Sequence, residues 1–314
     1  MTPPTDATVT VARVEDAAEI VAVVHAAFGA RAHVSPPPPA LAETAESIAE
    51  ELRCGSGVVA RVNGRIVGFI GVTVADGVAS LRRVSVHPDA QHHGVATLMV
   101  PAADQVAASL GARTGTLVVR REFPGLLAWW ERCGYHVVRT DELVHHLERH
   151  LPVLYRVPDA DAMRDLGARV AHVIRAGDLV LLEGDLGAGK TTFAQGFGAA
   201  LGVQEPITSP TFVLSRIHPA GDLELVHVDA YRLADADELD DLDLPSGAPQ
   251  VFLIEWGEGK AEHLASDRLW VSITRTADSD ERIIVIDGHG PRWAIDLDAA
   301  LDPTQRTLDP TKRN

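Results

Sequence analysis

The sequence predicts an α/β protein of two domains, and three observations lead to that prediction. The chain has 314 residues, which is too long for one ordinary hydrophobic core and suits two. In the N-terminal half, short alternating runs separated by turn residues indicate a meander of strands. In the C-terminal half, apolar runs alternate with helical patterns, which is typical of a partly parallel, mixed central sheet.

The N-terminal half is expected to combine this meander with four helices. Asn63-Gly64, between two alternating runs, is the strongest short hairpin signal in the chain. Pro101 lies inside a helical pattern and should kink or break it. The expected strands are 9–13, 57–62, 65–74, 78–86 and 116–119 with a strand pair over 135–147, and the expected helices are 16–28, 40–52, 94–110 and 125–133.

The C-terminal half is expected to alternate buried strands with helices. The expected strands are 179–183, 212–217, 224–228, 251–255, 269–274 and 283–286, and the expected helices are 161–176 and 191–201. The domains should span 8–150 and 159–301. A linker over 151–158, with a proline near each end, should join them, and a polar, frayed tail should follow at 302–314.

Composition and charge exclude several classes of protein. Apolar residues make up 46% and charged residues 23%, as in folded soluble proteins. The two cysteines, Cys54 and Cys133, give no disulfide framework and suit a reducing cytoplasm. We expect no signal peptide, and no apolar run approaches the length of a membrane span. Residues 151–314 carry 28 acids against 15 lysines and arginines, so this half should repel nucleic acid and meet any RNA only through a partner.

A phosphate-binding loop is predicted at Gly184-Asp-Leu-Gly-Ala-Gly-Lys190-Thr191, which fits G-x-x-x-x-G-K-[ST]. It follows the apolar run 179–183 and opens a helix, so its N–H groups can surround phosphate oxygens. Lys190 can reach the β- and γ-phosphates of ATP, and the Thr191 hydroxyl can ligate Mg²⁺. The expected ATP contacts are Asp185, Leu186, Gly187, Ala188, Gly189, Lys190, Thr191 and Thr192.

Two further apolar runs end in acids, at Asp229 and Glu255. The carboxyl ends of parallel strands meet at one edge of a sheet, so both acids should lie near the phosphate loop. Either can hold Mg²⁺ or orient a water there. Hydroxyls of the segment 208–212 can sense the γ-phosphate, although the same residues also fit a plain Ser-Pro turn.

These motifs carry a family resemblance. GDLGAGKTT, SPTF, HVDAYR (227–232) and IEW (254–256), in this order, resemble the TsaE ATPases of tRNA threonylcarbamoyladenosine synthesis over about 157–292. The resemblance implies a weak ATPase that binds the TsaB–TsaD pair and resets it between turnovers. It also implies that Lys190 cradles phosphate and that Thr191 and Glu255 hold Mg²⁺. Asp229 would support either catalysis or the water shell of the metal ion.

The motif HVDAYR is followed by an acidic run, Asp235–Asp243. Such a run is usually a solvated face, and the alternative is a docking surface for a basic partner.

In the N-terminal half, Val86-His-Pro-Asp-Ala-Gln91-His-His-Gly94-Val-Ala96 leads from a strand end into a helix. Backbone N–H groups at such a junction can bind a pyrophosphate. V-x-P-x-x-Q-x-x-G-x-A resembles the acetyl-CoA signature of the GNAT acetyltransferases, whose fold this resemblance implies over 9–147. The acetyl-CoA contacts that it implies are Val86, Gln91, His92, His93, Gly94, Val95 and Ala96.

No single catalytic residue stands out in that half. Many GNAT members have a tyrosine acid where this chain has Trp130, and an indole N–H cannot serve as one. Many also have an asparagine where this chain has Phe123. The titratable candidates are Glu122, acting through water, and the loop histidines His87, His92 and His93.

Two alternatives stay open. The C-terminal half could be a small-molecule kinase, although no arginine-rich lid segment is evident, and the N-terminal half could bind acyl-CoA without catalysis. If it does catalyse, a protein N-terminal amine is the acceptor suggested by a related ribosomal-protein acetyltransferase that is often encoded beside these tRNA-modification genes.

Overall fold

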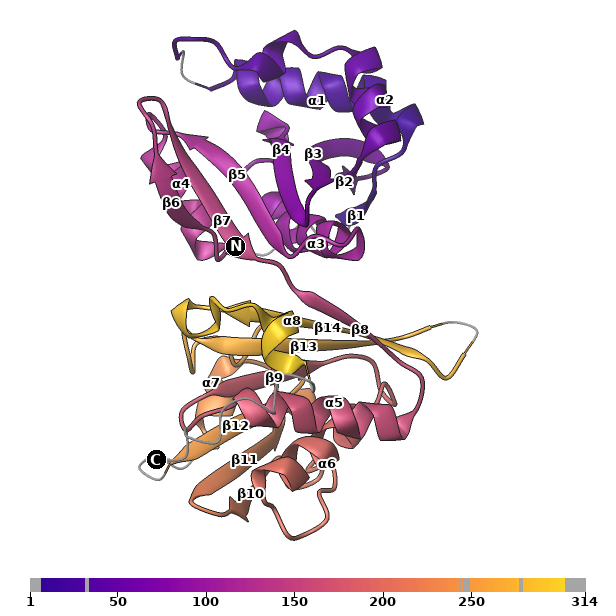
Figure 1. Ribbon diagram of the computed structural model, residues 1–314, viewed down its shortest axis with the longest axis vertical. Coiled ribbons are helices and arrows are strands. Elements are labelled where there is room, and N and C mark those ends of the chain that lie inside the picture. The colour runs from indigo at the N-terminus through magenta and orange to yellow at the C-terminus, as the bar shows by residue number, and fades with distance from the viewer. Residues whose placement is uncertain (1–6, 32–33, 243, 245–248, 277–278, 303–314) are drawn as a thin grey trace. The chain divides into compact units, whose positions relative to one another are not determined.

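The computed structural model describes residues 7–31, 34–242, 244, 249–276 and 279–302. The chain divides into two compact units, Met1–Leu151 and Pro152–Asn314 (Figure 1). Each unit has one seven-stranded sheet with a hydrophobic core on either face. Within the described ranges, no helix combines the length and the apolar character that crossing a bilayer requires.

The sheet of the first unit has the strand order β1-β2-β3-β4-β5-β7-β6. Neighbouring strands run antiparallel except β4 and β5, which are parallel. The strands are β1 (Thr8–Val11), β2 (Ser56–Val62), β3 (Arg65–Ala75), β4 (Val78–Val86), β5 (Thr114–Arg120), β6 (His136–Thr140) and β7 (Val144–His150).

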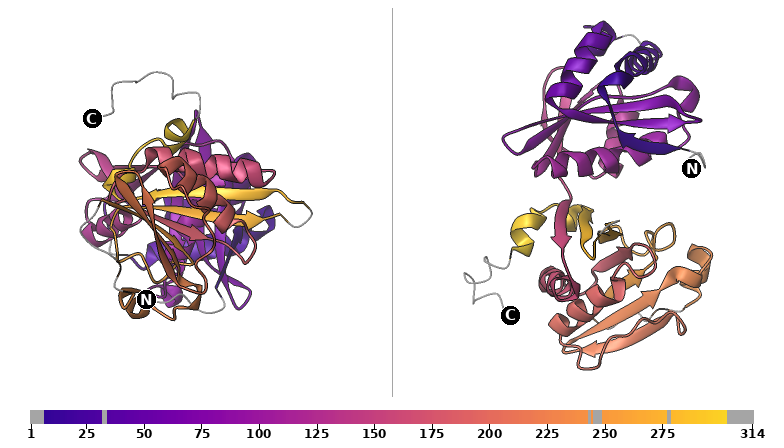
Figure 2. Two further views of the ribbon diagram at one scale, coloured as in Figure 1. Left: turned by 90° about the horizontal axis from the view of Figure 1, so that it is seen from below. Right: turned by 90° about the vertical axis from the view of Figure 1, so that its right-hand side faces the viewer.

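Helices cover both faces of this sheet (Figure 2). They are α1 (Ala17–Gly29), α2 (Ala45–Cys54), α3 (Val95–Ser109) and α4 (Pro124–Arg132). Because side chains alternate along a strand, Val58 packs with α3 while its neighbour Val59 packs with α1 and α2. Gly68 lets α3 approach, since a Cβ there would lie 2.5 Å from the sulfur of Met99.

Two helices of this unit differ from expectation. The expected helix 40–52 is instead a 3₁₀ turn, Pro39–Ala42, followed by α2. The helix begins after Thr44 because two hydrogen bonds form a capping box there. The Thr44 hydroxyl oxygen accepts the Ser47 N–H, and the Ser47 hydroxyl oxygen accepts the Thr44 N–H. A kink or a break was expected at Pro101, and the break does not occur: α3 continues through Pro101 with one backbone bond fewer.

The sheet of the second unit has the order β10-β11-β12-β9-β13-β14-β8, and its four central strands are parallel. The mixed α/β sheet expected from the sequence is therefore confirmed. The strands are β8 (Val153–Val157), β9 (Leu179–Glu183), β10 (Ser215–Ala220), β11 (Leu223–Asp229), β12 (Gln250–Glu255), β13 (Arg268–Arg275) and β14 (Arg282–His289), and the helices are α5 (Ala160–Val173), α6 (Lys190–Leu201), α7 (Ala236–Asp240) and α8 (Leu297–Leu301).

The segment 151–158, expected to be a linker, contains strand β8. It pairs antiparallel with β14, and its residues alternate between inward and exposed positions. The start of β10 is also later than expected, because the N–H groups of Val213 and Leu214 turn back to the Pro210 carbonyl. The tail expected at 302–314 lies outside the described residues from 303 onward.

Candidate functional site

A glycine-rich loop joins β9 to α6 in the second unit. Three glycines of this loop have positive φ angles, which residues with a Cβ rarely adopt. The angles are 145° at Gly184, 76° at Gly187 and 118° at Gly189. A Cβ on Gly184 would also lie 2.4 Å from the carbonyl oxygen of Ile273. The backbone therefore takes the tight turn that a phosphate loop needs, with the N-terminus of α6 behind it.

Lys190, the first residue of α6, lies within this loop and is 5% exposed. Its Nζ donates to the carbonyl oxygens of Gly184 (2.7 Å) and Asp185 (3.2 Å) and lies 3.9 Å from the ring centre of Trp256. Burial lowers the pKa of Lys190, and nearby carboxylates, Glu255 first, oppose that effect. A cation thus lies where the sequence predicts phosphate binding.

Asp229 and Glu255 end neighbouring parallel strands and are register partners. Glu255 is also paired with Leu182, two residues before the loop begins. Both acids are buried, at 3% and 2% exposure. The structure therefore brings Asp229, Glu255 and Lys190 to the same edge of the sheet, while the roles assigned to them stay predictions.

Asp229 holds the Ser-Pro segment against this edge. Its Oδ2 accepts hydrogen bonds from Thr211 Oγ1 at 2.5 Å and from Ser209 Oγ at 3.4 Å. Its Oδ1 accepts the Tyr231 N–H at 3.0 Å. The hydroxyls of Ser209 and Thr211 are therefore linked to the candidate catalytic acid, whereas that of Thr208 accepts from Arg216.

Two residues at this edge were missed from the sequence. His227 Nε2 is 2.9 Å from Glu255 Oε1, and both side chains are buried. Glu183, the last residue of β9, accepts the Glu258 N–H at 2.7 Å. Burial raises the pKa of Glu183 to about 7. The alternation of β11 carried a signal for His227, since it lies two residues before Asp229 and so on the same face.

Large apolar side chains surround the loop and are open to solvent. Leu186 of the loop is 82% exposed, Phe212 is 86% exposed and Tyr231 is 57% exposed. The Tyr231 ring lies 5.0 Å from that of Trp256, and Arg232 lies over Phe212. Exposed apolar side chains beside a polar site are typical of a protein-binding surface.

Part of the acidic run has structural contacts. Asp235 accepts the Glu238 N–H at the start of α7, and Glu238 accepts the Ala234 N–H. Asp240 pairs with His263 at 2.8 Å. The last acid expected in the run, at position 243, lies outside the described residues.

A cavity of about 890 Å³ opens in the first unit where β4 and β5 separate. These strands are paired over Val78–Ser80, and the next residues of each strand line the cavity. Of the expected acetyl-CoA contacts, Val86, Gln91 and Ala96 line it, and Gln91 Nε2 donates to the Val86 carbonyl at 2.9 Å.

The other expected acetyl-CoA contacts, His92, His93, Gly94 and Val95, form the turn into α3. His92 and Gly94 have φ angles of 63° and 75°. The first N–H groups of α3 have no carbonyl partner within the helix, which is the arrangement that binds a pyrophosphate.

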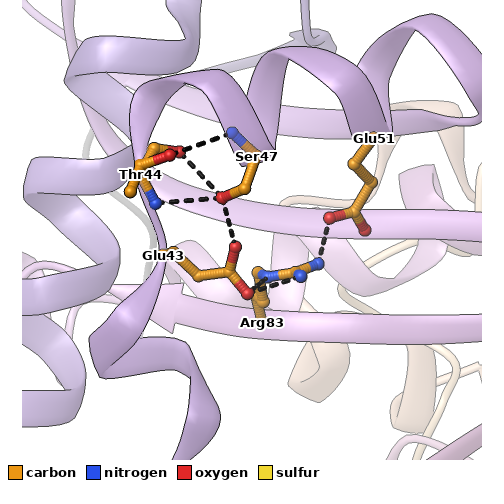
Figure 3. Close-up of polar contacts among 5 residues, drawn as sticks. All are labelled: Glu43, Thr44, Ser47, Glu51 and Arg83. Atoms are coloured by element: carbon orange, nitrogen blue, oxygen red, sulfur yellow. Dashed lines mark hydrogen bonds and ion pairs between the residues drawn. The ribbon is translucent and has the colours of Figure 1, made fainter.

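Buried charges support the wall of this cavity. The Arg83 guanidinium forms ion pairs with Glu43 and Glu51, and Ser47 donates to Glu43 at 2.6 Å (Figure 3). Burial raises the pKa of Glu43, but the bonds from Ser47 and Arg83 outweigh that effect and lower it. Arg83 has a φ of 51° beside a shift in the β3–β4 register, so the cluster holds a bulge in β4.

Of the candidate catalytic positions of this unit, Glu122, Phe123 and Trp130 line the cavity, whereas His87, His92 and His93 are not among its lining residues. Trp130 is packed edge-on against Tyr135. Glu122 is paired with Arg120 at 2.6 Å, which lowers the pKa of Glu122 and weakens it as a base. His87 accepts the Asp89 N–H at the start of a 3₁₀ turn.

Comparison with known proteins identifies both units. Residues 157–284 match the model "Threonylcarbamoyl adenosine biosynthesis protein TsaE", and residues 25–135 match the "Acetyltransferase (GNAT) family". The TsaE of Streptomyces coelicolor is 54% identical over 140 residues, covering 42% of this chain and 94% of that protein. The TsaE of Bacillus subtilis is 37% identical over 141 residues, covering 45% and 89%.

Solved structures match each half of the chain. Bacillus subtilis YdiB is 32% identical with a TM-score of 0.40, covering 48% of this chain and 93% of that one. The Thermoplasma acidophilum PaiA N-acetyltransferase in complex with coenzyme A is 16% identical with a TM-score of 0.41, covering 46% and 99%. From the sequence matches to the TsaE proteins and to the acetyltransferase model, the chain belongs to the TsaE family and carries a GNAT acetyltransferase domain before its TsaE domain.

Proposed function

We propose that the second unit hydrolyses ATP as a component of tRNA threonylcarbamoyladenosine synthesis. The observation that carries this proposal is the meeting of Lys190, Asp229 and Glu255 at one sheet edge beside a glycine-rich loop. Lys190 and the loop N–H groups bind the phosphates of ATP through Asp185–Thr192. Asp229 positions the attacking water, and its bonds to Thr211 and Ser209 connect that step to the Ser-Pro segment.

Magnesium fits the donors available at this edge. The Thr191 hydroxyl and the Glu255 carboxylate are hard oxygen ligands of the kind that Mg²⁺ prefers. Glu255 is buried, and its Oε2 accepts no hydrogen bond from the residues that the structure describes. When bound, Mg²⁺ would be held by these oxygens and would offset the charge that develops in phosphoryl transfer.

The partner in this proposal is the TsaB–TsaD pair, which ATP hydrolysis resets between turnovers. The exposed side chains of Leu186, Phe212 and Tyr231 support docking at the rim of the nucleotide site, where a partner can sense the nucleotide. The excess of acids over bases in residues 151–314 disfavours direct contact with tRNA.

The first unit, in this proposal, transfers an acetyl group from acetyl-CoA to a protein N-terminal amine. The N–H groups at the start of α3 would bind the pyrophosphate of CoA, and the cavity between β4 and β5 would hold the acyl chain. The amine nitrogen would form the new bond to the acetyl carbon while the C–S bond breaks, and the proton that the nitrogen loses would pass to the sulfur, so that CoA leaves as the thiol.

The ATPase proposal is tested by measuring phosphate release from ATP and Mg²⁺ by the full chain, with and without its cognate TsaB–TsaD pair. We expect slow turnover alone, a marked rise with the pair, and loss of both in Glu255→Ala. Absence of stimulation by the pair would refute the proposal and direct attention to a small-molecule kinase.

The acetyltransferase proposal is tested by CoA release with acetyl-CoA and peptides that carry free N-termini. Ala96→Glu places a negative charge beside the expected pyrophosphate and should abolish both CoA binding and release. Acetyl-CoA binding by the wild type without CoA release would identify a non-catalytic binding module.

A further inference from the structure

Glu255 has a buried partner that the proposed function does not use. His227 lies on β11 and Glu255 on β12, two neighbouring parallel strands. The register pairs His227 with Leu253 and Asp229 with Glu255. His227 therefore lies two residues before the end of β11, on the face of the sheet that carries both acids. Neither side chain reaches solvent, with 0% and 3% exposure.

The contact between them is directional. A carboxylate oxygen can only accept a hydrogen bond, so at 2.9 Å the hydrogen lies on Nε2 of His227 and points at Oε1 of Glu255. The opposite ring nitrogen, Nδ1, is buried and meets no hydrogen-bonding group in the described part of the chain. Among the described residues the ring therefore has one hydrogen bond, and its partner is the Glu255 carboxylate.

A second buried histidine shows that burial alone does not create this contact. His218 on β10 is 2% exposed, its Nε2 has no partner among the described residues, and its ring centre is 6.4 Å from that of His227. It lies beside His227 on the neighbouring strand but forms no hydrogen bond with Glu255. It is thus a matched control for the effects of altering a buried ring in this layer.

We propose that His227 is a positioning residue that, by donating from Nε2 to Oε1, orients the Glu255 carboxylate as a ligand of the nucleotide-bound metal ion. This proposal rests on the assignment of Glu255 as a metal ligand in the proposed function. Groups that hold metal ligands in place commonly change metal affinity by about 10- to 100-fold when removed.

The test measures Mn²⁺ binding by electron paramagnetic resonance in the full chain saturated with a non-hydrolysable ATP analogue. His227→Met fills similar space without a donor, and we expect its Mn²⁺ dissociation constant to rise by about 10- to 100-fold. His227→Gln keeps an N–H at a reach similar to Nε2 and should restore most of the affinity. Nucleotide affinity in EDTA should be equal in both variants and the wild type.

His218→Met is the structural control and should leave Mn²⁺ binding unchanged. The proposal is overturned if His227→Met binds Mn²⁺ like the wild type, if His218→Met weakens binding equally, or if His227→Gln is as weak as His227→Met. If His227→Met does not fold, His227→Asn replaces it, because its shorter amide falls short of Glu255, and weaker Mn²⁺ binding than in His227→Gln is then expected.

The outcomes separate this proposal from the wider one. A wild-type chain that binds Mn²⁺ with nucleotide but gains no ATPase activity from TsaB–TsaD refutes the proposed function and leaves the role of His227 supported by its own variants. A wild-type chain that binds no Mn²⁺ with nucleotide refutes the role of His227.

Discussion

Glu183 should make the stability of the TsaE domain depend on pH near neutrality. Burial is the main cause that raises the pKa of its carboxyl from 4.5 to about 7, and the charge of Glu258 adds to it, while the Glu258 N–H and the Lys190 charge oppose it. The folded state therefore retains a proton that the unfolded state releases. The stability from this group is fully present below pH 4.5 and is lost as the pH rises through 7.

The size of the effect follows from the two pKa values. A difference between 4.5 and about 7 corresponds to about 3 kcal/mol for a fully buried group. Glu183 is only partly buried and water screens its charge, so we expect about 1 kcal/mol between pH 5 and pH 8. For a domain of this size that loss lowers the melting temperature by about 2–4 °C.

The assay compares thermal unfolding of the wild type and Glu183→Gln from pH 5 to pH 8, without nucleotide or metal. Glutamine does not titrate, so the variant should gain stability relative to the wild type as the pH rises. Glu205→Gln, which alters an exposed carboxylate of the same unit, should show no such trend. A difference between Glu183→Gln and the wild type that stays constant with pH would refute the reasoning.

Three further variants test other contacts. Lys190→Ala removes a charged donor to phosphate and should weaken ATP binding by about 10- to 100-fold in a fluorescent-nucleotide titration, and unchanged affinity would contradict the loop assignment. In Gly196→Ala the new Cβ would lie 1.9 Å from the Arg164 carbonyl oxygen, so the free energy of unfolding from chemical denaturation should fall by about 1–3 kcal/mol. Stability equal to that of the wild type would show that α5 and α6 can separate. Tyr135→Phe removes the hydroxyl that donates to buried Asp104 at 2.7 Å and should lower the stability of the first unit by about 1–3 kcal/mol, whereas an unchanged unfolding midpoint would count against that bond.

The fold was predicted best where burial dominates. The prediction of β9 is confirmed residue for residue, because a strand buried on both faces is a continuous apolar run between polar ends. Strand β8 was missed, since two flanking prolines resemble a linker and its pairing with β14 joins residues far apart in the sequence. The start of β10 was misplaced because the turn at Pro210 depends on local backbone bonds.

In the candidate sites, too, some residues could be located from the sequence, whereas the contacts between segments could not. The glycines of the phosphate loop and the acids Asp229 and Glu255 could be located from the sequence, because parallel strands deliver their carboxyl ends to one edge. The bond from His227 could not, because it depends on the register between two strands. In the acetyltransferase domain, the ion pairs around Arg83 join segments that only tertiary folding brings together.

Strand β8 has a practical consequence for dissecting this protein. A TsaE fragment beginning at residue 159 would lack Val153–Val157, which form the edge of its sheet. Main-chain N–H and C=O groups of β14 would then lie unpaired along Arg282–Ile286 and could pair with another molecule. Such a fragment is expected to self-associate. If its ATPase activity were weak, the cause would be the missing edge strand and not the absence of the acetyltransferase domain.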